Sequence, residues 1–229
     1  MIKYTKNVSE TPLEMLERLK EEKPELKDEK LSYAGRLDPM AEGEVMVLVG
    51  EENKEYKEHL KYDKEYEAVF IAKVSTDTGD VLGLITETGG EVEKLEEQVE
   101  ALKGIKEQKY PWFSSMTVDG KKLFDHFKSG NTDIERPSRK VSIKEVELLE
   151  SGHEKVQEYI LKNVAKVNGK FRQKETITRW KKYFEENKDD VFVFKVRILV
   201  STGTYIRGLT ENFNFPTTLL KLKRVKILT

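Results

Sequence analysis

Apolar residues recur at helical spacing in several segments of the chain. Residues 11–26 place apolar side chains every three or four positions between glutamates and lysines, which predicts an amphipathic helix. These side chains are Leu13, Met15, Leu16 and Leu19. Similar spacing, or a closing glycine, predicts further helices over residues 91–102, 121–128, 171–187 and 205–213.

Other segments have the pattern of strands. Residues 65–74 alternate two sets of apolar side chains, and residues 191–200 are almost continuously apolar, as expected for central strands of a sheet. The strands predicted in this way are residues 43–49, 65–74, 141–149, 156–167, 191–200 and 219–228. The order of elements predicts a mixed α/β (α+β) chain dominated by a sheet. We find no repeat or low-complexity linker, so we expect residues 1–229 to form a single domain.

Composition excludes several classes of protein. The 229 residues contain no cysteine and only 3 histidines, so disulfides and thiolate or histidine metal centres are not expected. No apolar run is long enough for a membrane span, which favours a cytoplasmic protein. The 41 basic and 42 acidic residues give a net charge of -1, where RNA-binding domains are often basic. The basic residues nevertheless cluster, and phosphate binding depends on the placement of cations rather than on their sum.

The loop that contains Asp38 is the most informative segment. Pro39 fixes its own φ and favours an extended Asp38, while Gly35 and Gly43 permit close approach of another backbone. A carboxylate held on such a stiff loop suits a nucleophile or a general base. The local chemistry alone favours the simpler interpretation, in which Asp38 merely begins a turn.

The sequence over residues 35–43, Gly-Arg-Leu-Asp-Pro-Met-Ala-Glu-Gly, resembles the catalytic loop of TruB-type tRNA pseudouridine synthases. Six further blocks resemble motifs of the same family in the same order: residues 64–68, 75–80, 111–124, 136–141, 201–207 and 222–224. The Gly-Thr-Tyr-Ile-Arg block at 203–207 is nearly identical to the family motif. Together the blocks span most of the chain, and their shared order makes coincidence improbable.

The resemblance implies a fold, a chemistry and the residues that perform it. We expect a large, mostly antiparallel sheet flanked by helices, with a catalytic cleft, and an enzyme that isomerises uridine to pseudouridine by base flipping without any cofactor. Asp38 is then the nucleophile or the base, Tyr66 the tyrosine that stacks on the target base, and Arg207 the cation that keeps Asp38 ionised. Asp80 matches the acidic partner of this arginine, with Asp77 as its competitor.

The resemblance also implies the residues that bind RNA and the substrate. Leu222 would form the apolar wall of the base pocket. The complete set of substrate-binding candidates is Tyr33, Arg36, Asp80, Lys121, Lys122, Tyr205, Leu222, Lys223 and Arg224. The expected substrate is the T-arm stem-loop of tRNA, with modification at the T-loop nucleotide 55, by a monomer that needs no protein partner.

The chain departs from the family pattern in several places. Tyr33 stands where the family usually has a histidine, and tyrosine cannot become positively charged near neutral pH. Residues 151–190 are longer than a simple hairpin and are interpreted as an insertion, and we expect no C-terminal RNA-binding (PUA-like) domain. These departures leave room for one alternative, the same chemistry on another structured RNA. A second alternative is a non-catalytic tRNA-binding chaperone, against which the joint presence of Asp38, Tyr66 and Arg207 argues.

Overall fold

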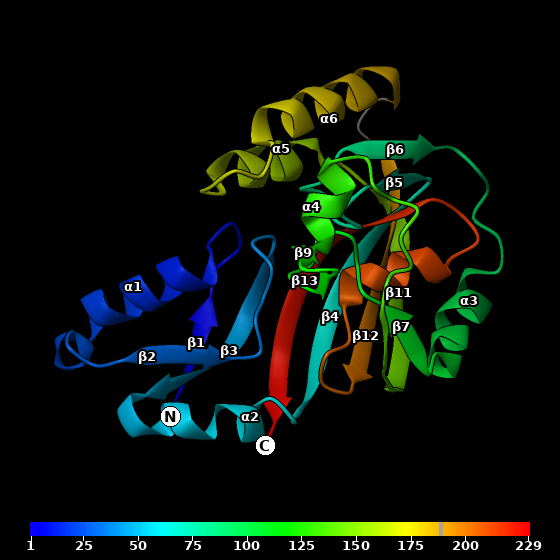
Figure 1. Cartoon of the computed structure of the whole chain (residues 1–229). Coiled ribbons are helices and arrows are strands. Elements are labelled where there is room, and N and C mark those ends of the chain that lie inside the picture. Colours follow the sequence, from blue (N-terminus) through cyan, green and yellow to red (C-terminus); the bar gives the residue numbers. More distant parts are fainter. Residues whose placement is uncertain (188–189) are drawn as a thin grey trace.

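The computed structural model describes residues 1–187 and 190–229. Positions 188 and 189, which belong to the predicted 151–190 insertion, lie outside the described residues. Seven strands form the central sheet, in the order β1-β3-β13-β4-β12-β11, with β2 paired to β3 (Figure 1). All neighbours are antiparallel except β13 and β3, which run parallel. This confirms the predicted mixed α/β class and the large, mostly antiparallel sheet.

The strands of the central sheet are β1 (Ile2–Lys6), β2 (Leu31–Ala34), β3 (Ala41–Val49), β4 (Asp63–Ala72), β11 (Ile143–Glu154), β12 (Val191–Val200) and β13 (Thr217–Leu228). Three two-stranded sheets contain β5 (Val74–Thr76) with β6 (Ile85–Thr88), β7 (Glu107–Lys109) with β10 (Ser138–Lys140), and β8 (Thr117–Val118) with β9 (Lys121–Lys122).

The α-helices are α1 (Pro12–Glu22), α2 (Tyr56–His59), α3 (Leu95–Ala101), α4 (Leu123–Lys128), α5 (Gln157–Lys166) and α6 (Gln173–Asn187). The 3-10 helices are η1 (Pro24–Leu26), η2 (Gly50–Glu55), η3 (Leu102–Gly104) and η4 (Ile206–Asn212). No helix of the described part is long and apolar enough to cross a membrane.

Alternate side chains of the central strands supply two separate cores. Phe70 and Phe194 belong to a core that also includes residues of α1, α3 and η4, whereas their neighbours Ile71 and Val193 pack in a second core with α5 and α6. Because successive side chains of a strand point to opposite faces, the two cores lie on opposite faces of the sheet. The helices α5 and α6 lie together at one end of the molecule, above the ends of the strands in this view (Figure 1).

Most predicted elements are confirmed, and one is wrong. Residues 156–167 were expected to form a strand, but they contain the helix α5. Its buried positions Ile160 and Val164, together with the flanking Val156 and Val167, recur every three or four residues, which is the spacing of a helix face. The predicted helix at 205–213 is a 3-10 helix, η4, rather than an α-helix.

Candidate active site

The loop that carries Asp38 connects β2 to β3 and is held by hydrogen bonds from the end of β1. Lys6, at the end of β1, is fully buried, and its ammonium group donates to the carbonyl oxygens of Asn7 (2.8 Å), Pro39 (3.2 Å) and Ala41 (2.6 Å). The backbone N–H of Ser9 donates to the Pro39 carbonyl oxygen as well, at 2.8 Å. Burial lowers the pKa of Lys6 to about 8. The chain that directly follows Asp38 is therefore held in place at Pro39 and Ala41.

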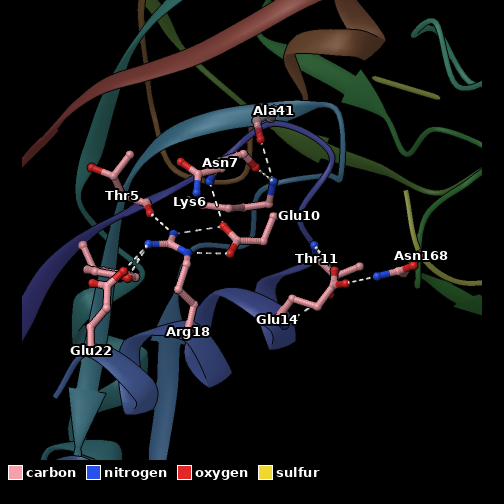
Figure 2. A network of polar contacts seen from close by, with 11 residues as sticks. Thr5, Lys6, Asn7, Glu10, Thr11, Glu14, Arg18, Glu22, Ala41 and Asn168 are labelled. Atoms are coloured by element: carbon pink, nitrogen blue, oxygen red, sulfur yellow. Dashed lines mark hydrogen bonds and ion pairs between the residues drawn. The ribbon is translucent and has the colours of Figure 1, made fainter. Parts of the chain in front are cut away.

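The segment that carries this lysine is itself tied to α1 (Figure 2). Arg18 donates from Nε to Glu10 (2.8 Å) and from Nη2 to the Thr5 carbonyl oxygen (2.7 Å), on either side of Lys6. Glu10 in turn accepts the backbone N–H of Asn7 at 2.8 Å. Lys6 is not among the site residues predicted from the sequence, because the sequence does not show that this lysine is buried.

Asp38 forms an ion pair with Arg207 across the site. The Nε of Arg207 donates to Oδ2 of Asp38 at 2.8 Å, and the other guanidinium nitrogens donate to the carbonyl oxygens of Thr78 (2.9 Å) and Phe113 (2.8 Å). The Arg207 side chain is 6% exposed and that of Asp38 is 37% exposed, so the carboxylate is accessible while its partner is fixed. Burial alone would raise the pKa of Asp38, but the charge and hydrogen bond of Arg207 hold it below its usual range. Asp38 is thus kept ionised.

Asp80 lies close to this pair without joining it. Its carboxylate accepts the Thr78 hydroxyl (2.7 Å) and the Leu82 backbone N–H (3.0 Å). Burial, reinforced by the negative charge of Asp38 and opposed by Arg207, raises the pKa of Asp80 to about 6. The ion-pair partner of Arg207 among the described residues is therefore Asp38. The negative charge of Asp80 affects Arg207 from a longer distance, without a hydrogen bond.

Asp77, the competitor of Asp80, has a different partner. It receives two hydrogen bonds from Arg172, which lies just before α6, at 2.7 and 3.1 Å. The Arg172 guanidinium also lies over the ring of Phe113, 4.7 Å from its centroid. Sequence reasoning missed this contact, because the 95 positions between the two partners carry no pattern that links them.

Two cavities meet at Asp38. The first, called the Tyr66 cavity, has a volume of about 370 Å³ and is lined by residues 35–38, 60, 61, 64, 66, 139, 202–207, 222 and 224. The second, called the Phe113 cavity, has a volume of about 390 Å³ and is lined by residues 36, 38, 39, 78, 80, 82, 113–115, 122, 124, 128, 170–172, 205 and 207. Arg36, Asp38, Tyr205 and Arg207 belong to both.

Most predicted site residues meet at these cavities. Tyr66, which is 5% exposed, and Leu222 line the Tyr66 cavity, while Asp80 and Lys122 line the Phe113 cavity. Arg36 and Tyr205 line both. The structure therefore brings Asp38, Tyr66, Asp80, Arg207 and Leu222 around one centre.

Three other candidates lie apart from the cavities. Tyr33 pairs with Val47 across the sheet and packs against the core of α1. Lys121 is exposed and donates to the Ser129 hydroxyl at 2.7 Å. Lys223 is exposed on β13. The two lysines are accessible to a large ligand such as RNA without lining the cavities around Asp38.

Arg224 requires a correction. It was predicted to contact phosphate, but it is 1% exposed and donates to the carbonyl oxygens of Glu44 (2.6 Å) and Gly35 (2.9 Å). Its backbone approaches β3 so closely that a Cβ at Gly43 would lie 2.2 Å from the Arg224 carbonyl oxygen. Arg224 therefore holds the start of the Asp38 loop and is not available to an external phosphate. A run of basic residues at the end of a sequence does not reveal which of them faces the core.

Comparison with known proteins identifies the family of the chain. The family described as "TruB family pseudouridylate synthase (N terminal domain)" matches residues 23–171. The tRNA pseudouridine synthase B of Staphylococcus aureus strain Newman is 30% identical over 211 residues, which is 88% of this chain and 58% of that protein. The corresponding protein of strain JH9 is 29% identical with the same coverage. The chain thus spans about three fifths of the length of these relatives.

Solved structures show the same fold. A Cbf5-Nop10-Gar1 complex matches with a TM-score of 0.55 and 19% identity, over 99% of this chain and 48% of that one. An archaeal box H/ACA sRNP Nop10-Cbf5 complex matches with a TM-score of 0.51 and 17% identity, over 99% and 47%. The expected pseudouridine synthase fold is confirmed by these matches. With the family match across residues 23–171, the chain belongs to the TruB family of pseudouridylate synthases.

Proposed function

We propose that this protein is an isomerase that converts a uridine in the T-loop of tRNA to pseudouridine, with Asp38 as the catalytic carboxylate. The observation that carries the proposal is the ion pair between Asp38 and Arg207, placed where the Tyr66 and Phe113 cavities meet. Either role of Asp38, nucleophile or base, requires its ionised form, and Arg207 favours that form. The family of the chain supports the reaction class.

The Tyr66 cavity has the properties required of a base pocket. Its volume of about 370 Å³ and its lining by Tyr66 and Leu222 suit a planar base placed between an aromatic ring and an apolar side chain. A uridine in a folded RNA loop is stacked on its neighbours, so it must be extruded before Asp38 can reach it. Contact with Tyr66 and Leu222 offsets part of the cost of that unstacking.

The Phe113 cavity is suited to the RNA strand beside the target. Exposed Lys122 and Lys128 lie 5.5 and 5.2 Å from the ring of Phe124, and exposed Lys170 lines the same cavity. Cations around an aromatic surface favour an RNA backbone with unpaired bases. The tRNA substrate itself is inferred from the relatives, which are named tRNA pseudouridine synthase B. We further propose that residues 1–229 work as one catalytic domain with residues 151–190 as an insertion, because α5 and α6 share a core with β4 and β12.

The test is a direct assay of the reaction. An unmodified tRNA transcript is incubated with the protein, and pseudouridine is mapped by chemical labelling. We expect one modified position, in the T-loop, and no product from a transcript that carries cytidine there. A T-arm stem-loop that folds without magnesium should be modified in the presence of a chelator, because none of the proposed steps uses a metal. Modification of a different RNA, with the tRNA untouched, would support the same chemistry on another target. RNA binding without any pseudouridine would support the chaperone instead.

A further inference from the structure

The Tyr66 cavity carries a large excess of positive charge. Most of its cations already form ion pairs or hydrogen bonds within the protein. Its charged lining consists of Asp38 and the cations Arg36, Lys61, Lys64, Arg139, Arg207 and Arg224. Arg207 neutralises Asp38, while Lys61 forms an ion pair with Glu58 on the surface. Lys64 and Arg224 donate to backbone carbonyl oxygens, of Tyr62 in one case and of Glu44 and Gly35 in the other.

Arg139 on β10 has neither kind of partner in the described part of the chain, and unlike Arg36, which is equally unpaired but exposed, it is half-buried. Its Nε is fully buried and has no hydrogen-bond partner, and no described carboxylate lies within ion-pair distance of the guanidinium. Arg136, three residues earlier, shows the usual outcome for a half-buried arginine in this protein, with two bonds of 2.9 Å to Glu211. An arginine without such a partner keeps its full capacity to bind an anion.

The guanidinium of Arg139 is nevertheless held in a fixed place. It lies against the turn that precedes η4, where a Cβ at Gly203 would come within 1.9 Å of Cζ and 2.1 Å of both terminal nitrogens. The ring of Tyr110 lies on another side, 5.9 Å from Cζ. Arg139 also pairs in register with Gln108, which exchanges two hydrogen bonds of 2.9 Å with the backbone of Tyr205. The backbone that carries Arg139 is therefore tied to the same turn that leads to Arg207.

We propose that Arg139 binds a phosphodiester group of the RNA, namely a linkage adjacent to the uridine whose base enters the Tyr66 cavity. The inference rests on the proposed function, since it assigns the nucleotide to this cavity. A planar guanidinium donates two parallel hydrogen bonds to phosphate oxygens, and a cation that is already partly desolvated gains more from such a partner than an exposed lysine does. Arg36, exposed at the same cavity, supplies a second cation. Gly203 has no side chain, and the Arg139 guanidinium occupies the space that a Cβ at this position would fill.

The test combines protein variants with chemically neutralised RNA. Binding of a T-arm stem-loop is measured in the Asp38→Asn background, so that the readout does not depend on turnover. In one set of RNAs, single phosphates around the target uridine are replaced by neutral methylphosphonates. With Arg139 present, one linkage beside the uridine should weaken binding by about tenfold to a hundredfold when it is neutralised, as expected for a charge-assisted pair. With Arg139→Gln, binding should be weak already, and neutralising that linkage should cost nothing more.

Matched variants separate this role from a general loss of charge or of structure. Arg139→Lys keeps the positive charge but loses the planar guanidinium that donates two parallel hydrogen bonds. It should therefore recover only part of the RNA affinity. Arg197→Gln removes an exposed arginine of β12 that pairs with Glu67, and it should behave as the unsubstituted protein does. Circular dichroism and thermal unfolding check that each variant is folded.

The inference is overturned if Arg139→Gln binds the unmodified RNA as tightly as the unsubstituted protein. It is also overturned if the variant remains as sensitive to every neutral linkage. In either case the Asp38-intact protein still forms pseudouridine, so the proposed function stands. Absence of pseudouridine from the intact protein, with binding and the phosphate effect preserved, would contradict the proposed function and leave the phosphate site supported.

Discussion

The two cavities that meet at Asp38 are built from different parts of the fold. The Tyr66 cavity has walls from β4, β13 and the turn before η4, and its cations Lys64 and Arg224 are bound to backbone carbonyl oxygens. The Phe113 cavity has walls from loops, α4 and the connection between α5 and α6, and its lysines are exposed at the rim. One side is therefore fixed by the sheet, and the other is fixed by contacts between distant loops.

This difference indicates that the two cavities have different roles in the reaction. A reacting group needs a fixed direction, which strands and buried hydrogen bonds provide. A phosphate backbone varies in position, and flexible lysines on loops follow it at little cost. Apart from Arg139, which we propose to bind phosphate, substitutions on the strand side should therefore change the rate of the chemical step, and substitutions on the loop side should change RNA affinity. The predictions below test this comparison at the shared residues first and then on the loop side.

Asp38→Asn should have the largest effect, because it removes the group that both cavities share. Asparagine is nearly isosteric but is neither a nucleophile nor a useful base, so we expect pseudouridine formation to fall by at least about a thousandfold. RNA affinity should change little, since both cavities keep their shape. Single-turnover assays and filter binding measure the two quantities. Turnover within about tenfold of the original rate, which is about 1.4 kcal/mol, would exclude Asp38 as the catalytic group.

Arg207→Gln should reduce the rate by about a hundredfold and change its dependence on pH. Arg207 holds the pKa of Asp38 below its usual range, so its removal raises that pKa and leaves burial opposed mainly by the smaller effects of the Arg36 and Lys6 charges. The acid limb of the pH profile should therefore move to higher pH, which a profile of kcat from pH 5 to 9 would show. Arg207→Lys should restore part of the rate and of the profile. A slower variant whose acid limb stays in place would mean that Arg207 acts through structure alone.

Asp80→Asn should change the pH dependence of stability. The pKa of Asp80 is about 6 in the fold and 3.8 for the free side chain, so the folded protein binds the proton more tightly than the unfolded chain does. Stability from this group is complete below pH 4 and is lost as the pH rises to about 6, by a few kcal/mol. Asparagine accepts the same two hydrogen bonds without a charge. Relative to the original protein, the variant should be more stable at pH 7 than at pH 4, as measured by urea unfolding.

If the stability difference between Asp80→Asn and the original protein is the same at both pH values, the pKa of Asp80 is not raised in the fold. Glu87→Gln on β6 is a suitable control, because that side chain is exposed. It should show no comparable dependence on pH.

The sequence could predict the strand side of the site better than the loop side, for a physical reason. Tyr66 on a strand with a strongly apolar pattern, Arg207 in a nearly complete motif and Asp38 beside a proline all carry local signals. Their meeting follows from the large, mostly antiparallel sheet with a catalytic cleft that the resemblance implied. Lys6 carries no such signal, because its burial depends on the β3 loop that folds over it, more than thirty positions away.

The misjudged elements have the same cause. Residues 156–167 were predicted as a strand because single apolar residues suit either a strand or a helix, and the packing against the sheet decided for α5. Arg224 was assigned to phosphate together with Lys223 because both belong to a basic block that resembles a family motif, but adjacent residues of a strand face opposite sides, and of the two Lys223 is exposed and Arg224 is buried. In both cases the long-range environment, which a single sequence does not show, determined the result.

The double substitution of Lys122 and Lys128 by glutamine should have the smallest effect on the reaction, and it tests the loop side directly. Both lysines are exposed and line the Phe113 cavity, so each is expected to neutralise an RNA phosphate. Affinity should fall, and the slope of log K against log salt should become shallower by somewhat under one unit for each lost contact. The rate at saturating RNA should stay within about twofold, because backbone contacts position the RNA without touching the reacting base.

The matched control neutralises Lys94 and Lys103, two lysines that pair with glutamates near α3 and lie outside both cavities. It removes the same amount of charge from the protein, so any effect of net charge alone appears equally in both double variants. If the two behave alike, the Phe113 cavity does not contact the RNA backbone. If the Lys122 and Lys128 variant instead slows the chemical step at saturating RNA, the loop side also positions the reacting base. The separation between a catalytic strand side and a binding loop side would then be wrong.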